Sequence, residues 1–118
     1  MTQLLIISTS PPYYSSAAQD ALEAALAASN VGLSVSFVFM GDGLYQLLND
    51  QDSKQIGKKS IAKQIKAMPL YDIEPIYFID SDLSERQISS NSILNVANAI
   101  SDLEFTHLCS TASCILRF

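Results

Sequence analysis

Short apolar runs alternate with polar turns and amphipathic stretches along this chain, and the alternation predicts an α/β protein. The first run, residues 4–7, is continuously apolar, which is typical of a strand covered on both faces. Residues 34–40 and 76–79 are rich in β-branched and aromatic side chains and predict two further strands. Residues 113–118 predict a final strand, whereas residues 92–97 fit a strand or a helix equally.

A long helix is predicted between the first two strands. Residues 17–30 are rich in alanine and leucine, which have high helix propensity. One face carries small and medium apolar side chains at helical spacing: Ala18, Ala21, Leu22, Ala25 and Leu26. Ser16 with Gln19 fits a capping box at the start, and Asn30 and Gly32 end the helix. The small side chains predict close packing of this helix on the sheet.

The segment after the second strand predicts a tight strand–turn–helix unit. Gly41 and Gly43 permit a sharp backbone turn, and Asp42 is positioned to cap a short helix that reaches about Leu48. In open parallel α/β sheets, functional sites form just outside such strand ends. This turn is therefore the first candidate for a functional position.

Two more helices are predicted in the second half of the chain. Residues 60–68 form one, which Ser60 caps. Its side chains divide into an apolar and a basic face, with Ile61, Ile65 and Met68 on the first and Lys59, Lys63 and Lys66 on the second. Residues 101–110 form the other, with Ser101 and Glu104 as a capping box.

The order of these elements predicts the architecture. Strands that alternate with helices indicate a three-layer α/β/α fold with a mostly parallel sheet of about five strands. A chain of 118 residues, 48% of them apolar, predicts a single domain over residues 1–118 with a substantial core. No apolar run approaches the roughly 20 residues that span a bilayer. The first residues are typical of a strand and not of a signal peptide, so a cytoplasmic location is expected.

Charge is distributed unevenly along the chain. The net charge of −5 argues against direct nucleic-acid binding, which relies on a basic face. Five of the seven basic residues nevertheless lie in one stretch with no acid among them: Lys54, Lys58, Lys59, Lys63 and Lys66. The last three are a candidate surface for an acidic partner or for nucleic-acid phosphates held elsewhere in a complex. Solvation of an ordinary helix face is the alternative.

Candidate catalytic groups are few. Cys109 falls late in a helix, where the helix dipole disfavours a thiolate, and Cys114 falls at the last strand, where burial is expected. Both are therefore expected to be structural. Asp80 and Asp82 are spaced as a carboxylate pair for acid–base or Mg²⁺ chemistry, although turn formation and capping explain them as well. The single histidine, His107, lacks companion ligands at a metal-site spacing.

The hydroxyl-rich loop of residues 8–16 lies between the first strand and a helix N-terminus, where anions often bind. It contains no glycine, however, and Pro11 and Pro12 remove two backbone donors, so no bound flavin is expected. Tyr13 and Tyr14 at its tip are candidate interface residues, because tyrosine buries a large area at low entropic cost. Packing of this loop on its own domain is the alternative.

Three segments, in this order, resemble the TusC/DsrF family of small sulfur-relay proteins over nearly the whole chain. The first comprises Gly41, Asp42, Gly43, Gln46, Leu47 and Leu48, the second Leu70, Tyr71, Asp72 and Ile73, and the third Leu116, Arg117 and Phe118. The loop of residues 11–14 departs from the family pattern, because relatives tend to have glycine there. This departure argues against a shared ligand-binding role for the loop.

The resemblance implies a subunit of a hetero-oligomer with TusB-like and TusD-like partners, and it favours a strand over residues 92–97. Such assemblies take persulfide sulfur from a TusA-like donor and pass it to a TusE-like acceptor, towards 2-thiolation of the tRNA wobble uridine. In sulfur-oxidising bacteria, the DsrE, DsrF and DsrH counterparts serve dissimilatory sulfur metabolism instead. The sulfur-carrying relatives have a cysteine near the end of the third strand, whereas residues 77–81 of this chain contain none. The resemblance therefore implies a non-catalytic structural subunit, with no cofactor and no metal of its own.

Two alternatives remain open at the level of sequence. One is a thiol sulfur carrier that acts through Cys109 or Cys114. The other is a flavodoxin-like module that binds a phosphate-bearing ligand at the strand ends.

Overall fold

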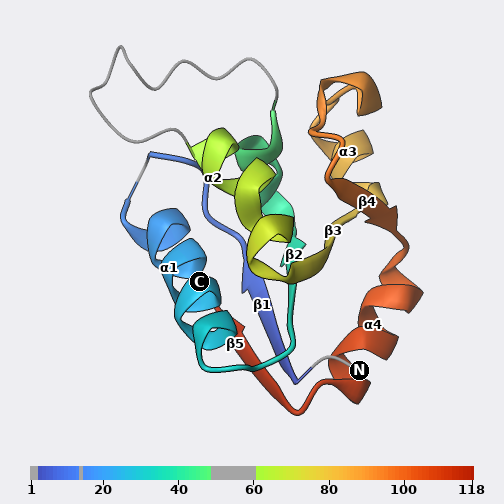
Figure 1. The fold of residues 1–118 in the computed structure, drawn as a ribbon. Helices are drawn as coiled ribbons and strands as arrows, with labels where there is room; N and C mark the ends of the chain where they lie inside the picture. Colours follow the sequence, from blue (N-terminus) through green and yellow to red (C-terminus); the bar gives the residue numbers. More distant parts are fainter. Residues whose placement is uncertain (1–2, 14, 49–60) are drawn as a thin grey trace.

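The computed structural model describes residues 3–13, 15–48 and 61–118 (Figure 1). The strands are β1 (Leu4–Ser8), β2 (Val35–Phe39), β3 (Ile73–Ile79), β4 (Ala97–Ile100) and β5 (Cys114–Arg117). The α-helices are α1 (Ala17–Asn30), α2 (Ile61–Ala67), α3 (Asp80–Glu85) and α4 (Asp102–Thr111). The 3₁₀ helices are η1 (Gly41–Leu47), η3 (Met68–Tyr71) and η4 (Ser90–Ser92).

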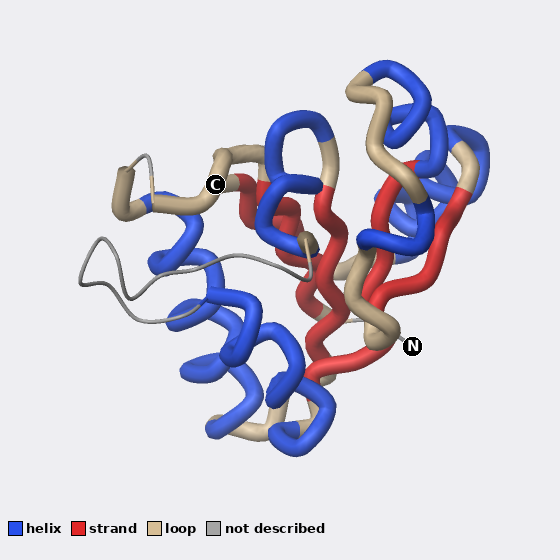
Figure 2. The backbone as a smooth tube through the Cα atoms, turned by 90° about the horizontal axis from the view of Figure 1, so that it is seen from above, coloured by secondary structure: helices blue, strands red, loops and turns tan. Residues whose placement is uncertain are grey.

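The five strands form one parallel sheet in the order β4-β3-β2-β1-β5. Residues of α1 and α2 pack on one face and residues of α4 pack on the other, so the predicted three-layer α/β/α fold is confirmed (Figure 2). The chain moves outwards from β1 through β2 and β3 to β4 and then returns to add β5 on the other side of β1. β1 is buried along its whole length, as its continuous apolar run predicted. β2, which was predicted from its alternating β-branched and aromatic residues, is buried along its whole length as well, Ser36 included.

The two faces of the sheet are covered to different depths. On the α1 side, Phe37 and Phe39 stack with ring centroids 4.7 Å apart, and four residues of α1 are buried. On the α4 side, a smaller cluster around Leu5 and Val38 meets Phe105 and Leu108, which stay partly exposed. Among the described residues, the main core therefore lies between the sheet and the α1 and α2 layer.

The ends of the long helices test the capping predictions. At the end of α1, Gly32 adopts φ +90°, its N–H donates to the Ser29 carbonyl, and the Leu33 N–H donates to the Ala28 carbonyl. This is a Schellman motif, so the predicted stop at Gly32 is confirmed. The capping box predicted at Ser16 is wrong, because Ser16 has helical backbone angles and its hydroxyl donates to the Asp20 carboxylate instead.

At α4 the corresponding prediction is correct. The Ser101 hydroxyl accepts from the Glu104 N–H, and the Glu104 carboxylate accepts from the Ser101 N–H, each at 3.1 Å. The two boxes differ because Ser101 has the extended backbone that a capping residue needs.

Two further predictions need correction. The fourth strand spans Ala97–Ile100 and not residues 92–97, because Ile93 and Leu94 are buried beside η1 and pair there with Leu48 and Leu47. Asp42 does not cap the helix after β2, because that helix begins one residue earlier, at Gly41. Ser60, the predicted cap of α2, lies outside the described residues. Among the described residues, no helix has the length and apolar character needed to cross a membrane.

Candidate functional site at the strand ends

The carboxyl ends of β1, β2 and β3 meet at one edge of the sheet, and the glycine turn makes their close approach possible. Gly41 takes φ +57°, a left-handed conformation that glycine adopts without penalty. Gly43 lies directly against the end of β1, where a β-carbon would stand 2.2 Å from the Ser8 carbonyl oxygen and 2.9 Å from its carbon. Only glycine fits this contact between η1 and β1. Gly41 is therefore required for its backbone conformation, and Gly43 for its lack of a side chain.

A buried amide joins η1 to the turn after β1. Gln46 is fully buried, and its Nε2 donates to the Ser8 hydroxyl at 2.7 Å and to the Ser10 carbonyl at 2.8 Å. The carbonyl acceptor fixes the orientation of the amide, since only the NH₂ group donates. Its Oε1 is buried without a hydrogen-bond partner among the described residues. Sequence reasoning placed Gln46 in a family motif but gave no sign of this connecting role.

A second network joins β2 to β3 at the same edge. The Gly41 N–H donates to Asp82 Oδ2 at 2.8 Å, so a carboxylate of α3, and not Asp42, accepts from the first N–H of η1. Arg86 then bridges the two acids, with Nε 3.1 Å from Asp42 Oδ1 and Nη1 3.4 Å from Asp82 Oδ1. Among the described residues, no group of three or more His, Cys, Asp or Glu is placed to hold a metal. The sequence left two roles open for Asp82, acid–base or Mg²⁺ chemistry and turn capping. Its contacts with the Gly41 N–H and with Arg86 are those of a capping residue.

No thiol lies at this edge among the described residues. β3 ends at Ile79 and continues directly into α3 with Asp80 and Ser81. Cys114 pairs with Leu4 at the opposite end of β1, about 13 Å away at the rise of a strand. The position expected for persulfide chemistry is therefore occupied by a carboxylate and a hydroxyl.

The two thiols have different surroundings. Cys114 is exposed, so its predicted burial is wrong. The reason is that β5 is an edge strand, paired only with β1, and all four of its residues are exposed. Cys109 is half-buried against the Leu5 and Ile7 side of the sheet, and this burial raises the pKa of its thiol. A raised pKa leaves less reactive thiolate at neutral pH.

These surroundings predict unequal alkylation. At pH 8 we expect iodoacetamide to modify Cys114 about ten times faster than Cys109, because access and thiolate fraction both limit the reaction of Cys109. Mass spectrometry of peptides over time measures both rates, and single-serine variants assign them. In urea the two rates should converge. Equal rates in the folded protein would contradict the burial of Cys109.

The predicted interface residues are only partly described. Tyr13 packs against the core of its own domain, and its hydroxyl accepts from the Ile61 N–H at 2.9 Å. Lys63 and Lys66 lie exposed on α2, on the side away from the core, as the helical pattern predicted. Tyr14 and Lys59, together with Lys54 and Lys58, lie outside the described residues. A role for any of these residues in an interface stays a prediction.

The other two family segments divide between surface and core. Leu70 and Tyr71 are exposed on η3, and Asp72 takes a left-handed conformation with φ +64° before the buried Ile73. At the end of the chain, Leu116 and Arg117 are exposed. Phe118 beside them packs against the main core, and its carbonyl accepts from the Thr9 N–H and hydroxyl. Each of these two segments therefore has one residue packed in or against the core, Ile73 or Phe118, beside exposed neighbours.

The architecture defines a small parallel α/β domain whose first strands are joined at their carboxyl ends by a glycine turn and a buried glutamine. A family model described as DsrE/DsrF-like family matches residues 2–118, and the chain belongs to this family. It is 31% identical over 118 residues to a protein TusC homolog of Vibrio vulnificus strain CMCP6, with all of both chains covered. It is 35% identical over 101 residues to a protein TusC homolog of Vibrio parahaemolyticus, with 86% of each chain covered.

Solved structures agree on the fold. The crystal structure of the ychN protein from E. coli superposes with a TM-score of 0.86 at 19% identity, with all of both chains covered. A protein from Bacteroides thetaiotaomicron superposes with a TM-score of 0.69 at 14% identity, covering 98% of this chain and 95% of the other. The membership of the TusC/DsrF family that the motifs predicted is confirmed.

Proposed function

We propose that this protein is a non-catalytic structural subunit of a cytoplasmic sulfur-relay complex. One observation carries the proposal: at the end of β3, where the sulfur-carrying relatives have a cysteine, this chain has Asp80, Ser81 and Asp82. A persulfide carrier needs an accessible thiolate. Cys109 lacks that character because burial raises its pKa, and Cys114 lies at the other end of the sheet.

In the proposed complex the chain has a structural role and does not itself carry sulfur. TusB-like and TusD-like subunits are its partners, and the TusD-like subunit holds the working cysteine. Sulfur enters from a TusA-like donor as a persulfide and leaves to a TusE-like acceptor, towards 2-thiolation of the tRNA wobble uridine. The acidic net charge of −5 supports protein partners over direct contact with RNA.

The exposure of Cys114 favours one competing function, a thiol carrier in its own right. In that case the Cys114 thiolate would attack the outer sulfur of a donor persulfide, release the donor as a thiol, and pass the sulfur on in the same way, without any cysteine at the strand-end site. The two functions make opposite predictions for a variant without thiols.

The decisive variant replaces both Cys109 and Cys114 by serine in the complex co-expressed with its two sibling subunits. We expect sulfur transfer from the donor to the acceptor, followed with ³⁵S, to stay within about twofold of wild type, because neither thiol lies on the route. The matched control replaces the working cysteine of the TusD-like subunit, which should abolish transfer. Loss of transfer in the Cys114→Ser variant, with the assembly intact, would instead assign the carrier role to this chain.

A further inference from the structure

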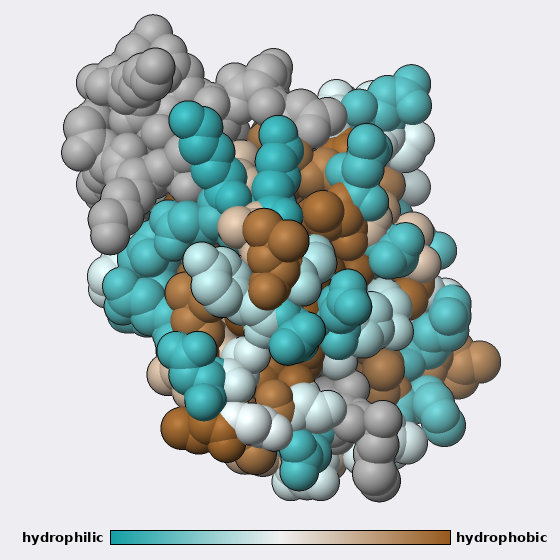
Figure 3. All heavy atoms as spheres, in the orientation of Figure 1, coloured by the Kyte–Doolittle hydropathy of each residue, from teal (hydrophilic) through white to brown (hydrophobic). Residues whose placement is uncertain are grey.

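The C-terminal layer of the protein is unusually open. α4 contains no fully buried residue over its ten positions, whereas α1 has four. Leu103 on α4 is 80% exposed, and every residue of β5 is exposed as well. Leu70 on η3 is exposed too, and Figure 3 shows apolar side chains at the surface among polar ones on one face of the molecule. Leu103 itself lines a groove of substantial size, whereas Leu70 is not among the residues that line the described grooves beside η3.

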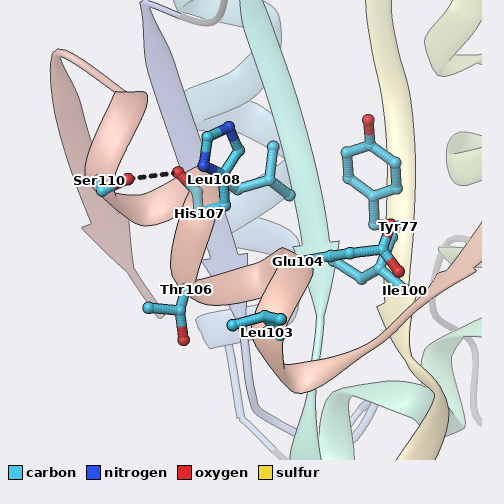
Figure 4. A pocket seen from close by; sticks show the side chains of 8 residues that line it. All are labelled: Tyr77, Ile100, Leu103, Glu104, Thr106, His107, Leu108 and Ser110. Carbon is cyan, nitrogen blue, oxygen red and sulfur yellow. Dashed lines mark hydrogen bonds between the residues drawn. The ribbon is translucent and has the colours of Figure 1, made fainter.

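The groove lies along α4 where the helix faces β3 and β4. Its volume is about 610 Å³, and its apolar lining comes from Tyr77, Ile100, Leu103 and Leu108. Figure 4 shows Tyr77 standing on the strand across from the side chains of α4, with Leu103 near the beginning of that helix. A groove of this size accommodates a few side chains of a partner segment. Leu103 is the most exposed apolar side chain among the four.

Negative charge borders the groove. Asp102 and Glu104 are exposed in the first turn of α4, and the helix carries no lysine or arginine. Ser81 donates to Asp102, which brings the N-terminal turn of α3, with its exposed Asp80, to the same end of the helix. The described lysines, Lys63 and Lys66, lie on α2 and hence on the opposite face of the sheet. The groove is therefore mostly apolar, with Thr106, His107 and Ser110 as further polar lining and an acidic border at the N-terminal end of α4.

We propose that the α4 groove is a docking surface for a basic segment of a partner protein, one that carries an aliphatic or aromatic side chain flanked by lysine or arginine. The apolar side chain would enter beside Leu103, and the flanking cations would meet Asp102 and Glu104. Charge complementarity selects this occupant. A two-fold pairing of two copies centred on Leu103 would instead bring the carboxylates of both copies together, which costs stability.

The proposal rests on the proposed function for the identity of the partner, which is one of the two sibling subunits of the relay complex. The test substitutes Leu103, whose side chain is largely in solvent, so that the fold should be retained. Leu103→Lys removes the apolar anchor and repels a basic partner, whereas Leu103→Glu removes the anchor but keeps the attraction. Matched controls are Val31→Lys and Val31→Glu, at a position 77% exposed at the end of α1.

The measurement is the dissociation constant of each variant for the co-purified sibling subunits, by native mass spectrometry at low salt. We expect Leu103→Lys to weaken binding at least about tenfold, Leu103→Glu to weaken it less, and both Val31 variants to bind within about twofold of wild type. Carbodiimide cross-linking, which joins carboxylates to amines, should connect Asp102 or Glu104 to a lysine of the same partner.

Each other outcome overturns a defined statement. If both Leu103 variants bind the sibling subunits as tightly as wild type, the docking surface is overturned and the proposed function is left intact. If Leu103→Lys and Leu103→Glu weaken binding equally, the partner segment is not basic. If the cross-links join two copies of this chain, the groove is occupied by a second copy and not by a sibling subunit. Failure of the wild-type chain to bind either sibling subunit counts against the proposed function itself. Circular dichroism and thermal unfolding of each variant confirm that its fold is retained.

Discussion

Replacing Gly43 by alanine is expected to destabilise the fold by about 3 kcal/mol or more, the upper end of the cost of overpacking. The added β-carbon would stand 2.2 Å from the Ser8 carbonyl oxygen and 3.3 Å from the α-carbon of Thr9. Both neighbours are backbone atoms, and Ser8 belongs to the buried strand β1, so neither can move aside alone. Urea unfolding followed by circular dichroism measures the loss.

Gly41→Ala is the control for this prediction. Gly41 has a left-handed φ of +57°, but a β-carbon added there would meet only the Arg86 guanidinium, at 3.7 Å, among the described residues. Alanine at this position incurs the conformational cost alone, about 1 kcal/mol. A Gly43→Ala variant as stable as Gly41→Ala would show that η1 and β1 separate easily, and would contradict the close contact described above.

Replacing Gln46 by leucine is expected to cost about 2–3 kcal/mol. The substitution keeps a side chain of similar length but leaves the Ser8 hydroxyl and the Ser10 carbonyl without their donor. Each buried polar group left unpaired costs about 1–3 kcal/mol, and removal of the unpaired Oε1 offsets part of the total. Urea unfolding again provides the measurement, and the turn after β1 should become more accessible to proteolysis.

A double-mutant cycle with Ser8→Ala isolates this contact. If the amide acts through Ser8 and Ser10, then Ser8→Ala should cost less in the Gln46→Leu background than in the wild type. Additive effects of the two substitutions would mean that Gln46 does not depend on Ser8. A Gln46→Leu variant within about 0.5 kcal/mol of wild type would remove the connecting role assigned to the amide.

The strand-end site has an organisation that fits a structural subunit. Its polar groups are engaged with one another: Gln46 with the turn after β1, Asp82 with the Gly41 backbone, and Arg86 with Asp42 and Asp82. These contacts hold the ends of three strands in fixed positions. The open surface of the described chain lies elsewhere, along α4 and β5. This combination of a closed site and an exposed face agrees with the proposed function.

Several features followed from the sequence because they depend on neighbouring residues. The alanine-rich pattern of residues 17–30 and the stop at Gly32 predicted the bounds of α1, since helix propensity and left-handed termination are local properties. The continuous apolar run of β1 predicted a strand covered on both faces, and the β-branched and aromatic residues of β2 predicted a strand. The absence of cysteine after β3 and the order of the family segments could also be read from the sequence without the structure.

Other features depended on strand order, which local patterns do not encode. β5 has the composition of an internal strand, but its place beside β1 at the edge of the sheet exposes Cys114, Leu116 and their neighbours. β4 was misplaced because Ile93 and Leu94 pack beside η1, a contact between segments far apart in sequence. The connections of Gln46 to Ser8 and of Asp82 to Gly41 likewise join residues 38 and 41 positions apart. Local propensity determined the helices and inner strands of this protein, whereas only tertiary packing decided its exposed edge and the network at its strand ends.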